Sequence, residues 1–397
     1  MALFSSARRV LLPVLLISLM APSAVWAMPQ LLVDTKTMEV LYEEDAGQPW
    51  HPASLTKLMT AFVAFQAIAE GRVSLETRVI LSRKAVSQAP ASSGLKAESG
   101  LSMKDALYVM LVKSANDVAW AIAETVGGTE QTFVDEMNAT AKRMGLTATH
   151  FENPNGLPDA AQVTSARDLA VLGLYIRQMF PQYLTIFKTE AVMLGKQRLE
   201  SNNGLLTSFA GTTGMKTGYV CGSGLNIVAT VERNGRSLMA VVLGGSSARE
   251  RNEMTAQLFL RGFAGALKGT GRTVTAIGNT GSAPMDMRPL LCGKEAAEYV
   301  AKRKAEFPLG LKGQPSYLTD DVEGQVYAAT DLGRRRDVPF PRQRPGGAPQ
   351  AVAVMEQSPS TPAVSGTTVT SDAVNTVGAQ RAPTPMPRLD RGGLASR

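Results

Sequence analysis

The order of apolar and polar positions predicts strands at both ends of one folded unit. Alternation over residues 30–42 indicates a pair of strands around a polar turn at 34–37. Two apolar, β-rich runs, 225–232 and 236–243, flank Asn234-Gly235. This dipeptide strongly favours the tight turn of a β-hairpin, so the late segment also indicates paired strands.

The middle of the same unit has the spacing of helices. Ser102 with Asp105, and Ser165 with Asp168, have the spacing of helix N-terminal caps. Gly71 ends the first apolar helical run. The expected helices cover 54–70, 102–112, 117–126, 130–144, 165–180 and 249–263.

These elements predict an α/β fold of the α+β kind. An antiparallel sheet formed by the N- and C-terminal segments would be covered by helices on both faces, with a helical middle subdomain between the two groups of strands. The unit would extend over residues 28–265.

The first 27 residues have the pattern of an export signal. Arg8-Arg9 is followed by an apolar run, 10–20, and by small residues that end at Ala27. That order is typical of a secretory signal peptide, and the run is too short to span a bilayer comfortably. The mature chain would begin near Met28, outside the cytoplasm; an uncleaved anchor is the alternative.

The region after the folded unit divides into two parts. Residues 266–340 form a poorly defined C-terminal extension, in which 294–306 could be a helix. Residues 341–397 are rich in Pro, Ala, Ser and Thr with scattered arginines. Such a composition cannot offset its ordering entropy, so we predict a disordered basic tail.

Charge and composition exclude several classes of function. The net charge of +7 lies at the chain ends, since residues 332–397 carry nine arginines and four acids, and the body is near neutral. No nucleic-acid surface is therefore expected on the folded part. Two histidines and two cysteines exclude a four-cysteine zinc site, and a nucleophile would need a base other than histidine. Whether Cys221 and Cys292 pair stays open at this point, because the sequence does not give their separation.

Ser54 and Lys57 are the first candidates for chemistry. Three residues apart at a helix start, they lie on one face about one turn apart. A neutral lysine amine can take the proton of a serine hydroxyl if burial or a nearby cation lowers the lysine pKa. The alternative is a capping serine followed by an exposed lysine.

Two further short motifs could complete a site. Ser114-Ala115-Asn116 offers a hydroxyl that can relay a proton and an amide that can hold a lysine and a substrate carbonyl. Lys216-Thr217-Gly218 offers a positive charge, a hydroxyl and a glycine that would let a substrate backbone approach a strand edge. The alternatives are a turn between helices and a hairpin entry. Each motif alone is weak; their order along the chain is the informative signal.

The joint pattern resembles one family. The chain is similar, over about residues 29–264, to the low-molecular-mass penicillin-binding proteins, which are serine-type D-alanyl-D-alanine carboxypeptidases (peptidase S11-like). The segments that carry the resemblance are 52–60, 113–117, 151–157, 164–169 and 214–219.

The resemblance implies a β-lactamase/DD-peptidase-like fold and a role for each motif. Ser54 would be the acylated nucleophile and Lys57 its base, while Ser114 and Asn116 would bridge Lys57 and substrate. The carboxylate of the substrate would be bound by Lys216 and Thr217, beside Gly218. The backbone N–H groups of Ser54 and Tyr219 would form the oxyanion hole, and such a donor is typically worth about 3 kcal/mol of barrier. Arg251 would also face that carboxylate, although Arg249 has a similar claim.

The implied partners are peptidoglycan stem peptides, and β-lactam antibiotics as covalent inhibitors. No metal and no cofactor are expected. An endopeptidase acting on cross-links would use the same bond chemistry. A class A-type β-lactamase would need a glutamate for deacylation, for which Glu152 is the candidate. A non-catalytic wall-binding protein of the same fold is the third alternative. Membrane attachment stays open, because the terminus at 388–397 has no apolar face.

Overall fold

The structure is a computed structural model that describes residues 28–294, 296–306, 315–334, 387 and 389. The predicted signal peptide, and the predicted disordered tail apart from residues 387 and 389, lie outside the described residues.

The main sheet joins the two ends of the folded unit, as predicted. Its strands lie in the order β2-β1-β9-β8-β7, and every neighbouring pair is antiparallel. Asn234 and Gly235 have φ angles of 50° and 75°, the left-handed conformation that the tight turn between β8 and β9 requires. The strands are β1 (Gln30–Asp34), β2 (Val40–Glu44), β7 (Thr212–Val220), β8 (Gly224–Arg233) and β9 (Arg236–Gly245).

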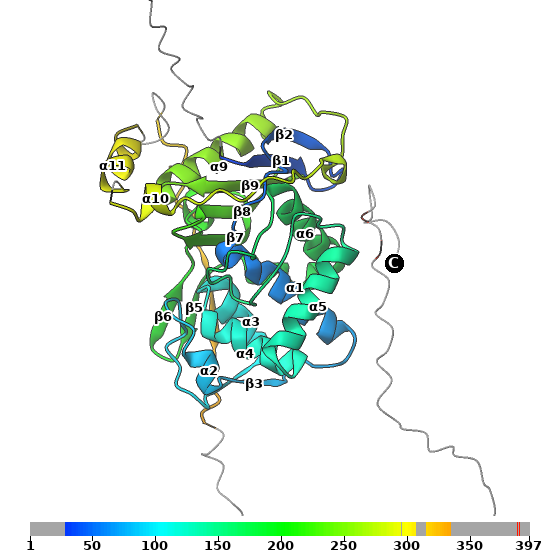
Figure 1. The fold of residues 1–397 in the computed structure, drawn as a ribbon, viewed down its shortest axis with the longest axis vertical. Coiled ribbons are helices and arrows are strands. Elements are labelled where there is room, and N and C mark those ends of the chain that lie inside the picture. Colours follow the sequence, from blue (N-terminus) through cyan, green and yellow to red (C-terminus); the bar gives the residue numbers. More distant parts are fainter. Residues whose placement is uncertain (1–27, 295, 307–314, 335–386, 388, 390–397) are drawn as a thin grey trace, which may run out of the picture.

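Helices cover both faces of this sheet, so the predicted fold class is confirmed (Figure 1). One face packs on α9 (Ala248–Phe263), and the other on α6 (Ala166–Met179). Successive side chains of a strand point to opposite faces, and β9 divides accordingly. Ala240 belongs to the core cluster on the α9 side, and Met239 and Val241 belong to the larger cluster on the opposite side.

The helices that separate the two groups of strands along the chain form a lobe on one side of the main sheet (Figure 1). Its central helix, α1, is buried over most of its length. The predicted caps are confirmed, because the Ser102 and Ser165 hydroxyls accept the N–H groups of Asp105 at 3.0 Å and Asp168 at 3.1 Å. Besides α6, the lobe contains η1 (Ala53–Thr56), α1 (Lys57–Ala69), α2 (Arg83–Val86), α3 (Met103–Val112), α4 (Asn116–Gly127) and α5 (Glu130–Arg143), followed by η2 (Pro181–Tyr183) and α7 (Leu184–Lys188).

Two small sheets flank the lobe, and the sequence pattern did not predict them. The strand β10, far along the chain, pairs in parallel with β5, so part of the C-terminal extension packs on the folded unit. The strands are β3 (Arg78–Ile80), β4 (Gly100–Ser102), β5 (Thr189–Leu194), β6 (Gln197–Glu200) and β10 (Gln325–Ala329), and α8 (Leu205–Ser208) follows β6.

The segment after α9 returns along the sheet before it forms two further helices. It contains η3 (Val274–Ala276), α10 (Arg288–Leu291) and α11 (Ala296–Glu306). The helix expected at 294–306 is therefore confirmed, with its start two residues later. The open question about the cysteines is also answered, since Cys221 and Cys292 form a disulfide. The division of the chain at residue 265 stays a prediction.

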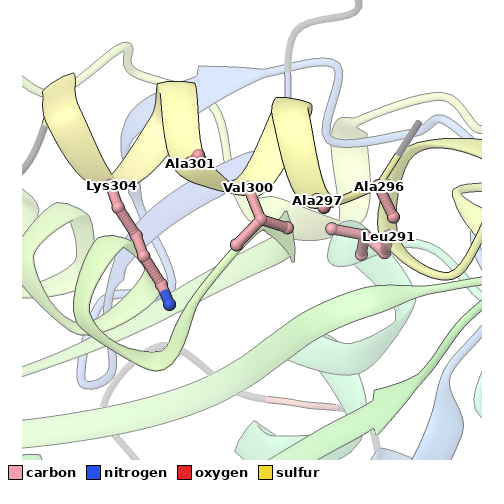
Figure 2. A pocket seen from close by; sticks show the side chains of 6 residues that line it. All are labelled: Leu291, Ala296, Ala297, Val300, Ala301 and Lys304. Carbon is pink, nitrogen blue, oxygen red and sulfur yellow. The ribbon is translucent and has the colours of Figure 1, made fainter.

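A hollow of about 380 Å³ lies beside α10 and α11. Figure 2 shows Val300 and Lys304 projecting from one face of α11, with Leu291 of α10 nearby. Its lining residues are Leu291, Ala296, Ala297, Val300, Ala301 and Lys304.

Candidate active site

Ser54 and Lys57 meet where η1 passes into α1. Ser54 lies in η1 and is half-buried, whereas Lys57 is the first residue of α1 and is fully buried. The Lys57 amine donates to the Ser54 hydroxyl oxygen at 3.0 Å. The spacing of three residues therefore places the two groups in direct contact, as the sequence predicted.

The same amine has two more partners, one at the start of α4 and one in the turn at 153–156. It donates to Asn116 Oδ1 at 2.7 Å and to the backbone carbonyl of Asn155 at 2.5 Å. Sequence reasoning found Asn116 but missed Asn155, because a backbone carbonyl leaves no side-chain signal. The turn Asn153-Pro154-Asn155-Gly156 was the available signal.

This turn reaches Lys57 because it packs directly on η1. Thr60 donates to the carbonyl of Pro154 at 2.6 Å. Gly156 has φ +86°, and a Cβ at this position would lie 2.0 Å from the Ala53 carbonyl oxygen. Only glycine allows this close approach. Gly156 therefore helps to hold the Asn155 carbonyl beside the lysine.

The surroundings of Lys57 disfavour its charged form. Burial lowers the pKa of Lys57 well below its ordinary value, and the nearby Lys216 lowers it further, while Asp117 acts in the opposite direction. A lysine whose pKa is lowered in this way can hold a neutral amine near neutral pH. Such an amine is able to accept the proton of the Ser54 hydroxyl.

The second motif lies at the junction of α3 and α4. Ser114 is buried with φ 64°, and its hydroxyl forms no hydrogen bond with another residue in the described part of the chain. Asn116 begins α4, and its N–H donates to the carbonyl of Ala91 at 2.7 Å. The Asp117 carboxylate accepts the N–H of Ser93 at 2.9 Å, which fixes the same junction.

The third motif lies on β7, at the edge of the main sheet. Lys216 and Thr217 are buried, and the Lys216 amine donates to the carbonyl of Thr217 at 2.9 Å. Burial, and then the charge of Arg251, lower the pKa of Lys216 to about 7. The motif therefore combines a cation that titrates near neutral pH with a free strand edge.

Arg251 and Arg249 differ in their surroundings. Arg251 is buried in α9, and its guanidinium donates to Asn252 Oδ1 at 2.9 Å and to the carbonyl of Asn202 at 3.2 Å. Burial lowers the pKa of Arg251 to about 10. Arg249 is exposed. Of the two arginines, Arg251 has the electrostatic contact with Lys216.

Gly218 packs against η1, a contact that the sequence did not predict. A Cβ at Gly218 would lie 2.9 Å from the carbonyl oxygen of Pro52, 3.0 Å from Ser54 N and 3.1 Å from Leu55 N. The missing side chain therefore makes room for η1. The contact brings the backbone N–H of Ser54 close to β7. Next to Gly218, Tyr219 is 51% exposed.

Ser54 opens into a cleft of about 470 Å³. Its walls come from η1, from the loop around Gly156, and from the end of β7. Asn116 and Tyr219 also line it. Glu152 is outside this lining; it is exposed and contacts His150 Nε2 at 2.9 Å.

A known protein family matches most of the folded unit. The family model described as D-alanyl-D-alanine carboxypeptidase, peptidase S11, matches residues 18–247. That match covers more than half of the chain and includes all three motifs, but it ends before Arg249 and Arg251.

The chain belongs to the D-alanyl-D-alanine carboxypeptidase family.

Individual members of the family are similar at moderate identity. D-alanyl-D-alanine carboxypeptidase DacC of Escherichia coli (strain K12) is 35% identical over 250 residues, or 61% of this chain and 62% of that relative. The matched region thus spans less than two thirds of that protein.

Solved structures of penicillin-binding proteins are also similar to the chain. Penicillin binding protein 6B from Escherichia coli has 33% identity and a TM-score of 0.56, covering 59% of this chain and 76% of that one. Penicillin-Binding Protein D2 from Listeria monocytogenes, in its cefotaxime bound form, has 31% identity and a TM-score of 0.54. The similarity covers 59% of this chain and 96% of that one. The predicted membership and the DD-peptidase-like fold are both confirmed.

Proposed function

We propose that the chain is a serine-type D-Ala-D-Ala carboxypeptidase that removes the terminal D-alanine from peptidoglycan stem peptides. The observation that carries this proposal is the buried Lys57 amine, 3.0 Å from the Ser54 hydroxyl, with its pKa lowered by burial and by Lys216. A nucleophile with an adjacent neutral base is the arrangement that acyl transfer requires.

Ser54 Oγ would attack the carbonyl carbon of the D-Ala-D-Ala bond while Lys57 takes its proton. The backbone N–H groups of Ser54 and Tyr219 would stabilise the negative charge on the carbonyl oxygen. The C–N bond then breaks, and the leaving nitrogen of D-alanine receives the proton from Lys57 through the Ser114 hydroxyl. Water hydrolyses the acyl-enzyme and regenerates Ser54.

The third motif would select the free C-terminal carboxylate. Protonated Lys216, the Thr217 hydroxyl and Arg251 form the positive end of the site, and a carboxylate that binds there stabilises the charged form of Lys216. β7 is an edge strand in the described sheet, so its outer edge can pair with an extended peptide. The same features support β-lactam antibiotics as covalent inhibitors, since they mimic the D-Ala-D-Ala dipeptide.

Two other enzymatic functions, those of a β-lactamase and of an endopeptidase, are the alternatives to the proposed carboxypeptidase. A β-lactamase role for Glu152 has no support in the geometry, because this side chain is exposed and lies outside the lining of the cleft. An endopeptidase that cleaves cross-links would use the same residues in the same roles. Only the substrate distinguishes an endopeptidase from a carboxypeptidase.

We also propose that the protein works outside the cytoplasm. The pattern of residues 1–27 supports export, and the Cys221–Cys292 disulfide is typical of an oxidising compartment. Among the described residues, no helix is long and apolar enough to cross a membrane.

The test is mass spectrometry of a synthetic stem peptide ending in D-Ala-D-Ala, and of a cross-linked dimer, incubated with the native protein and with Ser54→Ala. We expect loss of one alanine from the free peptide with the native protein only. Cleavage of the dimer alone would identify an endopeptidase. No reaction of either substrate with the native protein would overturn the proposed function.

A further inference from the structure

The segment 286–292 lies beyond the region that the family model matches, yet it forms part of the wall of the cleft. Three contacts hold it at the end of β7. Cys292 is bonded to Cys221, the N–H of Met287 donates to the carbonyl of Gly222 at 3.0 Å, and the Tyr219 hydroxyl lies 3.5 Å from Cys292 Sγ. This part of the wall is therefore built by the C-terminal extension.

The segment contributes Arg288 to the lining of the cleft and places Asp286 next to it, beside Gly222. Arg288 Nε donates to both carboxylate oxygens of Asp286, each at 2.9 Å. The two terminal nitrogens of Arg288 have no partner among the described residues, and its side chain is 63% exposed. A Cβ on Gly222 would lie 3.4 Å from Asp286 Oδ1, 3.7 Å from Arg288 Nε and 3.8 Å from His51 Cδ2. Asp286 and Arg288 therefore both lie beside Gly222.

Arg288 is the one arginine or lysine among the described residues that line the cleft. The other ionisable groups of the lining are His51 and Asp159, apart from Tyr219. Asp159 is exposed and lies within the segment that follows Gly156. A carboxylate entering the cleft therefore has Arg288 as its natural partner.

The direction of β7 indicates which part of a substrate would lie beside Arg288 and Gly222. In the proposed function, the terminal carboxylate lies at Lys216 and Thr217, and the reacting carbonyl lies near Ser54, opposite Gly218. A peptide that pairs with this edge therefore continues toward Gly222. The residue that precedes D-Ala-D-Ala would lie beside Asp286 and Arg288.

We propose that Arg288 and Asp286 form a subsite for the side chain of that preceding residue, and that the subsite favours a side chain ending in both a carboxylate and an ammonium, as in a diamino diacid. This inference rests on the proposed function. The free guanidinium nitrogens would take the carboxylate, and Asp286 would accept the ammonium. A side chain with an ammonium alone would meet the positive charge of Arg288 with no carboxylate to offset it.

The test compares three peptides, acetyl-X-D-Ala-D-Ala, in which X is meso-diaminopimelate, L-lysine or L-alanine. The native protein should hydrolyse the diaminopimelate peptide with a kcat/KM about fivefold above that of the lysine peptide, as for a partly exposed charge pair. Arg288→Ala should remove this preference, mainly through KM, and should leave the alanine peptide unchanged. Arg288→Lys should keep part of the preference.

Arg198→Ala is the matched control, because Arg198 also forms exposed ion pairs and lies outside the lining of the cleft. It should behave as the native protein with all three peptides. A preference that persists in Arg288→Ala would overturn the subsite, as would an equal loss on all three peptides, which would indicate a structural role only. Hydrolysis of no peptide by the native protein would instead overturn the proposed function, and the subsite with it.

Discussion

Lys57 differs from an ordinary surface lysine because it is buried and faces another lysine. Both effects lower the pKa of Lys57, and three oxygen atoms surround its amine at fixed positions. The neutral amine can donate to two of them, Asn116 Oδ1 and the carbonyl of Asn155, which leaves its lone pair to accept the proton of the Ser54 hydroxyl. The amine is therefore held in place while its neutral form is favoured. These are the two properties of a general base for Ser54.

Replacing Lys57 with alanine should lower the rate of acylation of Ser54 by a fluorescent penicillin by about 10²- to 10⁴-fold, the usual contribution of a general base. Lys36→Ala is the control, because Lys36 is an exposed lysine in the turn between β1 and β2. Circular dichroism would verify that both variants fold. An acylation rate within threefold of the native rate in Lys57→Ala would contradict the assignment of the base.

The two lysines predict a particular pH dependence. Lys57 must be neutral, which its lowered pKa allows at neutral pH, and Lys216 must be charged to bind a carboxylate. Because the pKa of Lys216 is about 7 in the free protein, its charge is present below that pH and is lost above it. We therefore expect kcat/KM to fall above pH 7, and the slope should approach about a tenfold decrease per pH unit.

The measurement is kcat/KM for D-alanine release between pH 5 and 10. In Lys216→Arg, the cation persists to higher pH, so the alkaline fall should move upward even if the absolute rate is lower. A native kcat/KM that stays constant from pH 7 to 9 would be inconsistent with this role of Lys216.

At the scale of elements, the site depends on close backbone contacts between η1, the turn at Gly156 and strand β7. Glycine at positions 156 and 218 permits these contacts, since a Cβ at either position would overlap the backbone of η1. The three motifs lie far apart along the chain, and this packing of the backbone brings them together.

Gly218→Ala should therefore displace η1 and reduce kcat/KM for D-alanine release by about 100-fold, as a shift of about 1 Å in a reacting group does. Gly281→Ala is the control, because a Cβ there would contact nothing within 4 Å. The account of Gly218 would be wrong if Gly218→Ala retained native activity with an unchanged melting temperature.

Elements specified by nearby residues were predictable from the sequence, whereas those that depend on distant partners were not. Asn234-Gly235 fixes its hairpin locally, and Ser102 and Ser165 mark helix starts. Strand β10 was missed because its partner β5 lies far away in sequence, and one short strand has little pattern of its own.

The candidate site divides in the same way. The motifs identified Lys57 and Asn116, but they could not show that the carbonyl of Asn155 completes the contacts of the lysine. The sequence offered Gly218 as a place where a substrate backbone approaches, and it could not show that η1 also packs there. The burial that separates Arg251 from Arg249 is set by tertiary packing and has no sequence signal.

At the scale of the whole molecule, distant parts of the chain are fastened together. The main sheet pairs β1 with β9, and the disulfide joins Cys221, at the end of β7, to Cys292 in the extension across 71 residues. A crosslink over a long loop restricts the unfolded chain, and its loss typically costs about 2–5 kcal/mol of unfolding free energy.

The double variant Cys221→Ala/Cys292→Ala should therefore unfold at a lower urea concentration than the native oxidised protein, with a loss of about 2–5 kcal/mol. The native protein treated with a reductant is the matched comparison and should shift in the same direction. Coincident unfolding curves for the oxidised protein and the double variant would show that the crosslink does not stabilise the fold.

The central claim is that Ser54 forms an acyl-enzyme. The most direct measurement is intact-protein mass spectrometry after incubation with benzylpenicillin, followed by peptide mapping of the adduct. The account predicts one added benzylpenicillin, located on the peptide that contains Ser54, and no adduct in Ser54→Ala. An unmodified native protein, or an adduct that maps to another residue and survives in Ser54→Ala, would contradict it.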